Sequence, residues 1–152
     1  MKQSYREGTW FAVPLNQGGY AAGLLARMAP GGKVVLAYFY GPKRAALPTL
    51  AELAGMRPGD AVKVARTGDM GLANGRWQVI GDAPDWQREL WPIPAFIRRS
   101  EPVRHAWRAV YADTDPGRPE REVSVPYDMT GLDIDLLYGY GSIELLLTKL
   151  LA

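Results

Sequence analysis

The sequence predicts a mostly β domain of the α+β class: an antiparallel curled sheet or small barrel, with one short internal helix and a C-terminal helix. Runs rich in β-branched and aromatic residues alternate with turns rich in glycine and proline, which is typical of antiparallel strands. Threonine followed three residues later by glutamate, ahead of a glycine, marks one short helix. Leucine and isoleucine recur at helical spacing near the end. With 152 residues, 47% of them hydrophobic, the chain fits a single domain covering residues 1–152.

The first three strands are expected to form a meander. They cover residues 9–15, 20–29 and 33–40, and glycine-containing turns join them. The second run is also compatible with a helix, but nothing before it offers a helix cap. Gly23 within it suggests a strand with a bulge. The third run is almost continuously apolar, which predicts a strand covered on both faces.

The two helices are expected at residues 49–54 and 142–151. Thr49 can cap the first helix and Glu52 can complete a capping box. Ser142 can cap the second, whose apolar residues recur at the spacing of one helical face. A strand through the same C-terminal residues is the alternative. A further strand is expected at residues 61–66.

Residues 66–94 are expected to form the centre of the domain, and they contain three of the five tryptophans. Asn74-Gly75 predicts a hairpin turn into a strand at residues 76–80. A loop stiffened by prolines then carries Trp86 and Trp91, with Arg88 between them. These three side chains could anchor a partner, since a stiff loop loses little entropy on binding. Alternatively, the two indoles fold back over the mouth of the barrel.

The rest of the chain is expected to alternate between loop and strand: a basic loop at residues 98–104, a strand at 105–111 and a polar loop at 113–122.

Charge is distributed unevenly along the chain. The net charge is +2, but residues 1–112 carry +7 and residues 113–152 carry −5. The acidic residues of the second part are Asp113, Asp115, Glu120, Glu122, Asp128, Asp133, Asp135 and Glu144. Such a cluster repels itself, so we expect Asp128, Asp133 and Asp135 to face a basic partner. A solvated surface of mixed charge is the alternative.

The sequence contains no recognisable catalytic, metal or cofactor signature. There is no cysteine, and His105 is the only histidine, so cysteine-based zinc sites and histidine clusters are excluded. If the protein were an enzyme, it would depend on carboxylates such as Asp69, Asp85 and Glu89. We expect none of these roles, and no cofactor. A long apolar run and a signal-peptide pattern are both missing from the sequence, so we expect a cytoplasmic protein with no membrane contact.

A nucleic-acid-binding β-barrel is the alternative function. Basic residues lie beside aromatic ones at Arg98, Arg99, Arg104, Trp107 and Arg108, a combination that can bind single strands by stacking and phosphate contact. The acidic second part of the chain argues against it. Oligomeric state is left open.

Several segments resemble the immunity protein 26 family: YREGTWFAVPL, GGYAAGLLAR, AYFYGP, PTLAEL, RTGDMGLANGRWQVIGDAPDWQRELWPIPAF and GYGSIELLLTKLL. The resemblance runs from Tyr5 to Leu151 and rests on the order and spacing of these pieces. It implies a cytosolic protein of bacterial polymorphic-toxin systems that binds a cognate toxin domain and blocks it, without catalytic residues. It names no binding residues. From the residues themselves we expect the partner at Trp86, Arg88, Trp91, Asp128, Asp133 and Asp135.

Overall fold

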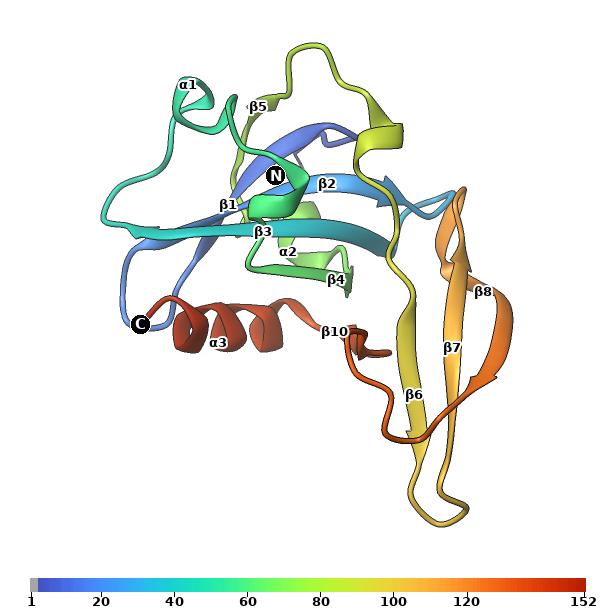
Figure 1. Cartoon of the computed structure of the whole chain (residues 1–152). Coiled ribbons are helices and arrows are strands. Elements are labelled where there is room, and N and C mark those ends of the chain that lie inside the picture. Colours follow the sequence, from blue (N-terminus) through green and yellow to red (C-terminus); the bar gives the residue numbers. More distant parts are fainter. Residues whose placement is uncertain (1–2) are drawn as a thin grey trace.

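The strands form two sheets in the computed structural model, which describes residues 3–152 (Figure 1). The six-stranded sheet has the order β10-β4-β3-β2-β1-β5. Its strands are β1 (Thr9–Pro14), β2 (Tyr20–Met28), β3 (Val34–Arg44), β4 (Lys63–Gly68), β5 (Val79–Asp82) and β10 (Leu137–Tyr138). The four-stranded sheet has the order β8-β7-β6-β9. Its strands are β6 (Phe96–Ser100), β7 (His105–Ala112), β8 (Asp115–Val125) and β9 (Asp133–Ile134).

The mostly β class with short helices and a C-terminal helix is confirmed. Within residues 3–152, however, neither sheet closes into a barrel, because each has two edge strands. The sheets are also mixed: β10 pairs with β4, and β9 with β6, in parallel. Figure 1 shows β6 and β7 extending away from the six-stranded sheet as a long hairpin. Residues 133–138 supply one short strand to each sheet and so join them.

The predicted meander of β1, β2 and β3 is confirmed, with antiparallel pairing throughout. Gly23 has a different role from the one predicted, because the register shifts of β2 lie on either side of it rather than at it. A Cβ atom at Gly23 would lie 2.3 Å from the Phe11 ring. Glycine at this position therefore leaves room for the aromatic ring of the neighbouring strand.

Both faces of the six-stranded sheet are buried, as predicted for β3. Phe11, Phe39 and Trp77 belong to a core on one face, which α3 (Tyr140–Leu150) covers with Ile143 and Leu147. The core on the other face is covered by Leu53 of α1 (Leu50–Leu53), by Trp91 and by the near ends of β6 and β7. The buried residues of this second core are Trp10, Ala22, Leu24, Ala26, Leu36, Tyr38, Tyr40, Leu53, Trp91, Phe96, Ala109 and Tyr111. The alternation of side chains along a strand explains how β3 contributes to both cores.

The capping box at Thr49 and Glu52 is confirmed. The Thr49 hydroxyl accepts from the Glu52 amide at 3.3 Å, and a Glu52 carboxylate oxygen accepts from the Thr49 amide at 2.9 Å. At the C-terminus the helix is confirmed and the strand alternative is wrong. α3 begins at Tyr140 with Gly139 as its N-cap, so the prediction that Ser142 caps it is also wrong.

The centre of the chain differs from the prediction at Asn74-Gly75. This turn follows a short helix, α2 (Met70–Ala73), rather than joining two strands. The strand after it begins at Val79, later than predicted, because the Trp77 amide donates to the Gly71 carbonyl at 2.8 Å instead of pairing with a strand. The indole of Trp77 is buried and stacks on Phe11, with ring centroids 5.4 Å apart. Two 3₁₀ turns, η1 (Pro58–Asp60) and η2 (Arg88–Leu90), complete the elements.

Two segments predicted as loops lie partly in strands. Of the basic segment, residues 98–100 belong to β6, whereas residues 101–104 form a turn, in agreement with the prediction. Of the polar segment, residues 115–122 belong to β8. Both pair with β7, the strand that was predicted at 105–111. Backbone pairing with β7 overrides their polar composition. Pro116 and Pro119 are compatible with β8 because an edge strand tolerates missing N–H groups.

Candidate partner-binding surface

The tryptophan loop is packed against the body of the protein. Trp91 is 8% exposed and makes edge contacts with Trp10 and Tyr38, with ring centroids 6.4 and 5.3 Å away. Trp86 is half-buried and stacks on Trp91 at 6.0 Å. A Cβ atom at Gly8, whose φ is +90°, would lie 2.9 Å from Trp86. The two indoles therefore fold inward, although residues 3–152 form no barrel mouth for them to cover, and Trp86 stays partly exposed.

Arg88 is held by carboxylates of its own chain. It donates to Glu7 at 2.8 Å and also pairs with Asp113, and these hydrogen bonds raise its pKa. The buried guanidinium of Arg27 donates to Asp113 at 2.9 Å and to the Arg88 carbonyl at 3.1 Å. Arg88 thus fastens the tryptophan loop to β2 and to the turn between β7 and β8.

The three aspartates expected to face a partner have different surroundings. The expectation of an exposed carboxylate is wrong at Asp135, whose side chain is 8% exposed. Asp135 pairs with Arg66 at 3.0 Å and accepts from the Tyr111 hydroxyl at 2.8 Å. Burial, followed by this hydrogen bond, raises the pKa of Tyr111 to about 12. Asp133 is exposed and pairs with Lys63 at 3.3 Å, and Asp128 is exposed.

The uneven charge of the chain is largely balanced by ion pairs between residues of the same molecule. Of the nine ion pairs within residues 3–152, six join a basic residue of the first part to an acidic residue of the second. They are Arg27–Asp113, Lys63–Asp133, Arg66–Asp135, Arg76–Glu144, Arg88–Asp113 and Arg98–Glu122. The expectation of a self-repelling acidic cluster is therefore wrong.

Glu144 is a buried carboxylate whose charge is balanced by Arg76. Its carboxylate is buried and accepts two hydrogen bonds of 2.7 Å from Arg76 and one of 3.0 Å from the indole N–H of Trp77. A buried carboxylate needs such partners, because an unpaired charge there would be costly. The arrangement joins α3 to the segment between α2 and β5.

The basic residues of the projecting hairpin also contact aromatic and acidic side chains of the same molecule. Arg98 lies over the Trp107 ring at 4.3 Å and pairs with Glu122 at 2.7 Å. Arg104 lies over the Tyr127 ring at 4.4 Å. His105 contacts the Ser124 hydroxyl at 3.0 Å. Glu122 neutralises the charge of Arg98, whereas the contacts with the aromatic rings and with the Ser124 hydroxyl remove no charge.

The carboxylates considered for catalysis do not meet in one place. Asp69 accepts from the Tyr5 hydroxyl at 2.9 Å and from the Lys33 amide at 3.0 Å, which fixes the turn before β3. Burial and the hydrogen bond to Asp69 raise the pKa of Tyr5 to about 12. Asp85 and Glu89 are exposed on the tryptophan loop. Within residues 3–152, no three histidine, aspartate or glutamate side chains are grouped as a metal ion requires.

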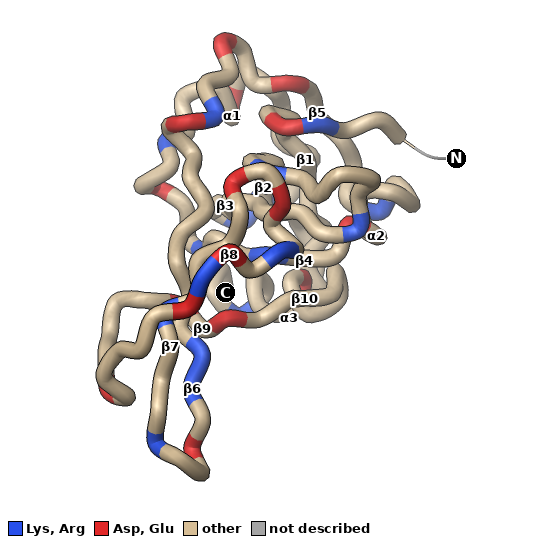
Figure 2. Tube along the Cα trace, turned by 90° about the vertical axis from the view of Figure 1, so that its right-hand side faces the viewer, with Lys and Arg blue, Asp and Glu red and all other residues tan. Residues whose placement is uncertain are grey.

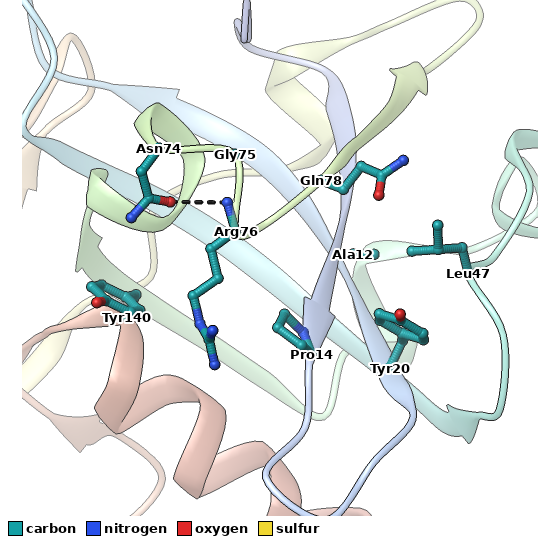
Figure 3. Close-up of a pocket in the computed structure, with 9 residues that line it drawn as sticks. All are labelled: Ala12, Pro14, Tyr20, Leu47, Asn74, Gly75, Arg76, Gln78 and Tyr140. Carbon is teal, nitrogen blue, oxygen red and sulfur yellow. Dashed lines mark hydrogen bonds between the residues drawn. The ribbon is translucent and has the colours of Figure 1, made fainter. Parts of the chain in front are cut away.

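An open hollow of about 670 Å³ lies at the end of β1 (Figure 3). It is lined by Ala12, Pro14, Tyr20, Leu47, Asn74, Gly75, Arg76, Gln78 and Tyr140. Figure 3 shows Arg76 extending between Tyr140 and Pro14, with Leu47 and Tyr20 on the other side. The Arg76 amide donates to the Asn74 side chain at 2.9 Å, which shapes the turn behind it. Tyrosine and arginine are frequent anchors of protein interfaces.

Sequence reasoning missed this hollow because its residues come from distant segments. The aromatic residues Tyr20 and Tyr140 belong to β2 and α3. The polar residues Asn74, Arg76 and Gln78 belong to the segment before β5. Asn74-Gly75 was the only local signal, and it indicated a turn rather than a site.

Comparison with known families gives one match. The model of immunity protein 26 matches residues 6–107, about two-thirds of the chain. The chain belongs to the immunity protein 26 family. Members of this family are immunity proteins of polymorphic toxin systems, a non-enzymatic class. No curated protein and no solved structure matches the chain.

The immunity protein 26 match covers most of the six-stranded sheet and the start of the four-stranded one. It contains β1 to β6, the tryptophan loop and every residue of the hollow except Tyr140. It ends at Trp107, within β7, so β8 and all later elements lie outside it. In residues 3–152 no helix is long and apolar enough to cross a membrane.

Proposed function

We propose that this protein binds the toxin domain of a cognate polymorphic toxin and neutralises it by direct protein–protein contact in the cytoplasm. The observation that carries the proposal is the immunity protein 26 match over residues 6–107. Immunity by binding needs no reactive group, only a surface that covers or distorts the toxin. The proposal does not depend on which reaction the toxin catalyses.

The architecture supports a binding role. The six-stranded sheet is buried on both faces and forms a rigid base, from which the four-stranded sheet projects. A stable protein interface covers about 800 Å² on each partner, and binding costs less entropy when the surface is already ordered. The projecting sheet and the hollow lined by Tyr20, Arg76 and Tyr140 offer such ordered surfaces.

The six residues expected to bind the partner divide into two groups under this proposal. Asp128 and Asp133 are exposed and can meet a basic toxin surface. The other four hold the binding surface in shape: Trp86 and Trp91 pack the loop inward, Arg88 fastens it, and Asp135 pairs with Arg66 where the sheets meet.

Co-expression tests the proposal directly. The probe is a candidate toxin domain, chosen as the C-terminal domain of a polymorphic toxin encoded beside the gene of this protein. It is expressed in a bacterium with and without this protein. We expect this protein to restore growth and to co-purify with the toxin domain in a one-to-one complex. A toxin domain from an unrelated polymorphic system serves as control and should be neither bound nor neutralised. If the neighbouring toxin domain stays lethal and unbound, the proposal is wrong.

A further inference from the structure

β8 is the edge strand of the four-stranded sheet, and one side of its backbone has no neighbouring strand within residues 3–152. Of its eleven residues, eight in succession, 117–124, are exposed. Figure 2 shows basic and acidic positions following one another along this strand. An edge of this length presents unpaired N–H and C=O groups, which can pair with a strand of another protein.

The two halves of β8 differ in how their edge is protected. The first half contains Pro116 and Pro119, and its pairing with β7 shifts register twice. Prolines and irregular register are the usual means by which proteins prevent unwanted strand pairing. The second half, residues 121–125, contains no proline and pairs with residues 106–110 of β7 in unbroken register. This half therefore lacks the prolines and register shifts of the first half, and its outer N–H and C=O groups can pair with a further strand.

The side chains of this second half alternate between the faces of the sheet. Val123 and Val125 lie on one face, and Val123 is 45% exposed. Glu122 and Ser124 lie on the other face, opposite Ala109 and Trp107. One carboxylate oxygen of Glu122 accepts from Arg98, and its side chain remains 37% exposed. Arg121 lies on the same face as Val123, so the edge offers a carboxylate on one face and an apolar residue beside a basic one on the other.

We propose that residues 121–125 of β8 receive a β-strand of the toxin domain, which extends the four-stranded sheet by a fifth strand. This inference rests on the proposed function and names the surface and the kind of partner segment. The backbone supplies hydrogen bonds, and the side chains select the partner. The toxin strand carries a lysine or arginine opposite Glu122 and a β-branched or aromatic residue opposite Val123, because unlike charges and apolar pairs stabilise neighbouring strands.

The extent of the family match supports this choice of surface. The match ends at Trp107, so β8 lies in the part of the chain that the family model does not describe. An immunity protein must recognise its own toxin and not those of its relatives. Such discrimination requires features that differ between related immunity proteins, and β8 lies outside the matched part of the chain.

Hydrogen exchange of individual amides tests the strand addition directly. The probe is the same toxin domain, added to the intact protein. Successive residues of a strand direct their N–H groups to opposite edges, so alternate amides of residues 121–125 already bond to β7. We expect the remaining amides to exchange quickly in the free protein and to become protected in the complex. A contact through side chains alone would leave them unprotected.

A charge reversal provides the second measurement. Glu122→Lys places a like charge opposite the basic toxin residue, and we expect the affinity for the toxin domain to fall about tenfold. The matched control is Glu101→Lys, an exposed residue at the tip of the β6–β7 hairpin, which should change the affinity less than about twofold. Circular dichroism and the thermal midpoint show whether each variant is folded.

The outcomes separate this inference from the proposed function. If the unaltered protein binds the toxin domain but the edge amides stay unprotected, or Glu122→Lys binds like Glu101→Lys, the strand addition is wrong and the proposed function stands. If the edge amides become protected at high protein concentration without toxin, a second copy occupies the edge and the inference is overturned. If the unaltered protein does not bind the toxin domain, both proposals fall.

Discussion

The two sheets of this protein are stabilised in different ways. In the six-stranded sheet, residues 35–40 of β3 are all buried, and an apolar core lies on each face. In the four-stranded sheet, eight successive residues of β8 are exposed. Apolar burial on both faces holds the first sheet together. The near ends of β6 and β7 share one of these cores, whereas farther along the hairpin arginines pair with Glu122 or lie over the rings of Trp107 and Tyr127.

The difference indicates a division of labour. Burial of apolar area is the main source of folding free energy, so the six-stranded sheet determines stability. Surface ion pairs contribute little each, so the four-stranded sheet can change its side chains at small cost. A protein that must match one particular partner benefits from this separation, because its recognition surface can vary while its core stays the same.

Truncating one large side chain in each sheet tests the comparison most strongly. Phe39 is fully buried in β3, and Phe39→Ala should lower the free energy of unfolding by about 3–5 kcal/mol through lost contacts and a cavity. Trp107 is only half-buried in β7, and Trp107→Ala should cost about 1 kcal/mol. Urea unfolding followed by circular dichroism measures both. Equal losses would mean that the four-stranded sheet stabilises the fold as much as the six-stranded sheet does.

A substitution at the junction between the sheets should lower the free energy of unfolding by an intermediate amount. Asp135→Asn leaves the buried guanidinium of Arg66 without its counter-charge and should cost about 3 kcal/mol. The control, Asp133→Asn, removes a carboxylate that is 57% exposed and should cost less than about 1 kcal/mol. Chemical denaturation of both variants compares them. Two equally stable variants would show that Asp135 is solvated like Asp133.

The smallest expected effect is the contribution of Asp113 to the pH dependence of stability. Hydrogen bonds from Arg88, and then from Arg27, hold the pKa of Asp113 below its usual range. A carboxylate whose folded-state pKa is depressed contributes stability above its unfolded pKa of about 3.9 and loses it as pH falls through the folded pKa. Because Asp113 is 60% exposed, the contribution should stay below about 1 kcal/mol.

Thermal midpoints measured between about pH 5 and pH 2 check this sign, since the unfolded carboxylate titrates in that range. The decline should be shallower in Asp113→Asn than in the unaltered protein. The control is Asp85→Asn, which removes an exposed carboxylate of the tryptophan loop and should leave the decline unchanged. A decline that is equally steep in Asp113→Asn would contradict the prediction.

Local patterns in the sequence predicted those elements of the fold that depend on interactions between residues close together in the chain. The meander followed from apolar runs between glycine turns, and the α1 cap followed from Thr49 and Glu52. The helical stripe at Ile143 and Leu147 predicted α3, although its first residue was placed two positions late. The family was recognised from the order of its segments along the chain, which is also a property of the linear sequence.

Features that depend on distant residues were not predictable in this way. β8 is polar and contains prolines, and only its pairing with β7 makes it a strand. Asp135 is buried because Arg66, 69 residues earlier in the chain, lies beside it. The surplus of positive charge before residue 113 and of negative charge after it suggested an external partner, whereas much of each surplus meets the other inside the protein.

The segment at residues 133–138 also constrains the time course of biosynthesis. It adds β9 to one sheet and β10 to the other, and a ribosome synthesises it after every other strand. Proteins fold from the N-terminus as they are made, at about 5–20 residues per second. The six-stranded sheet can therefore assemble around β1, β2 and β3 early, while the four-stranded sheet stays without its β9 edge until this segment is available. A nascent chain would complete the junction between its two sheets only after all the other strands have been synthesised.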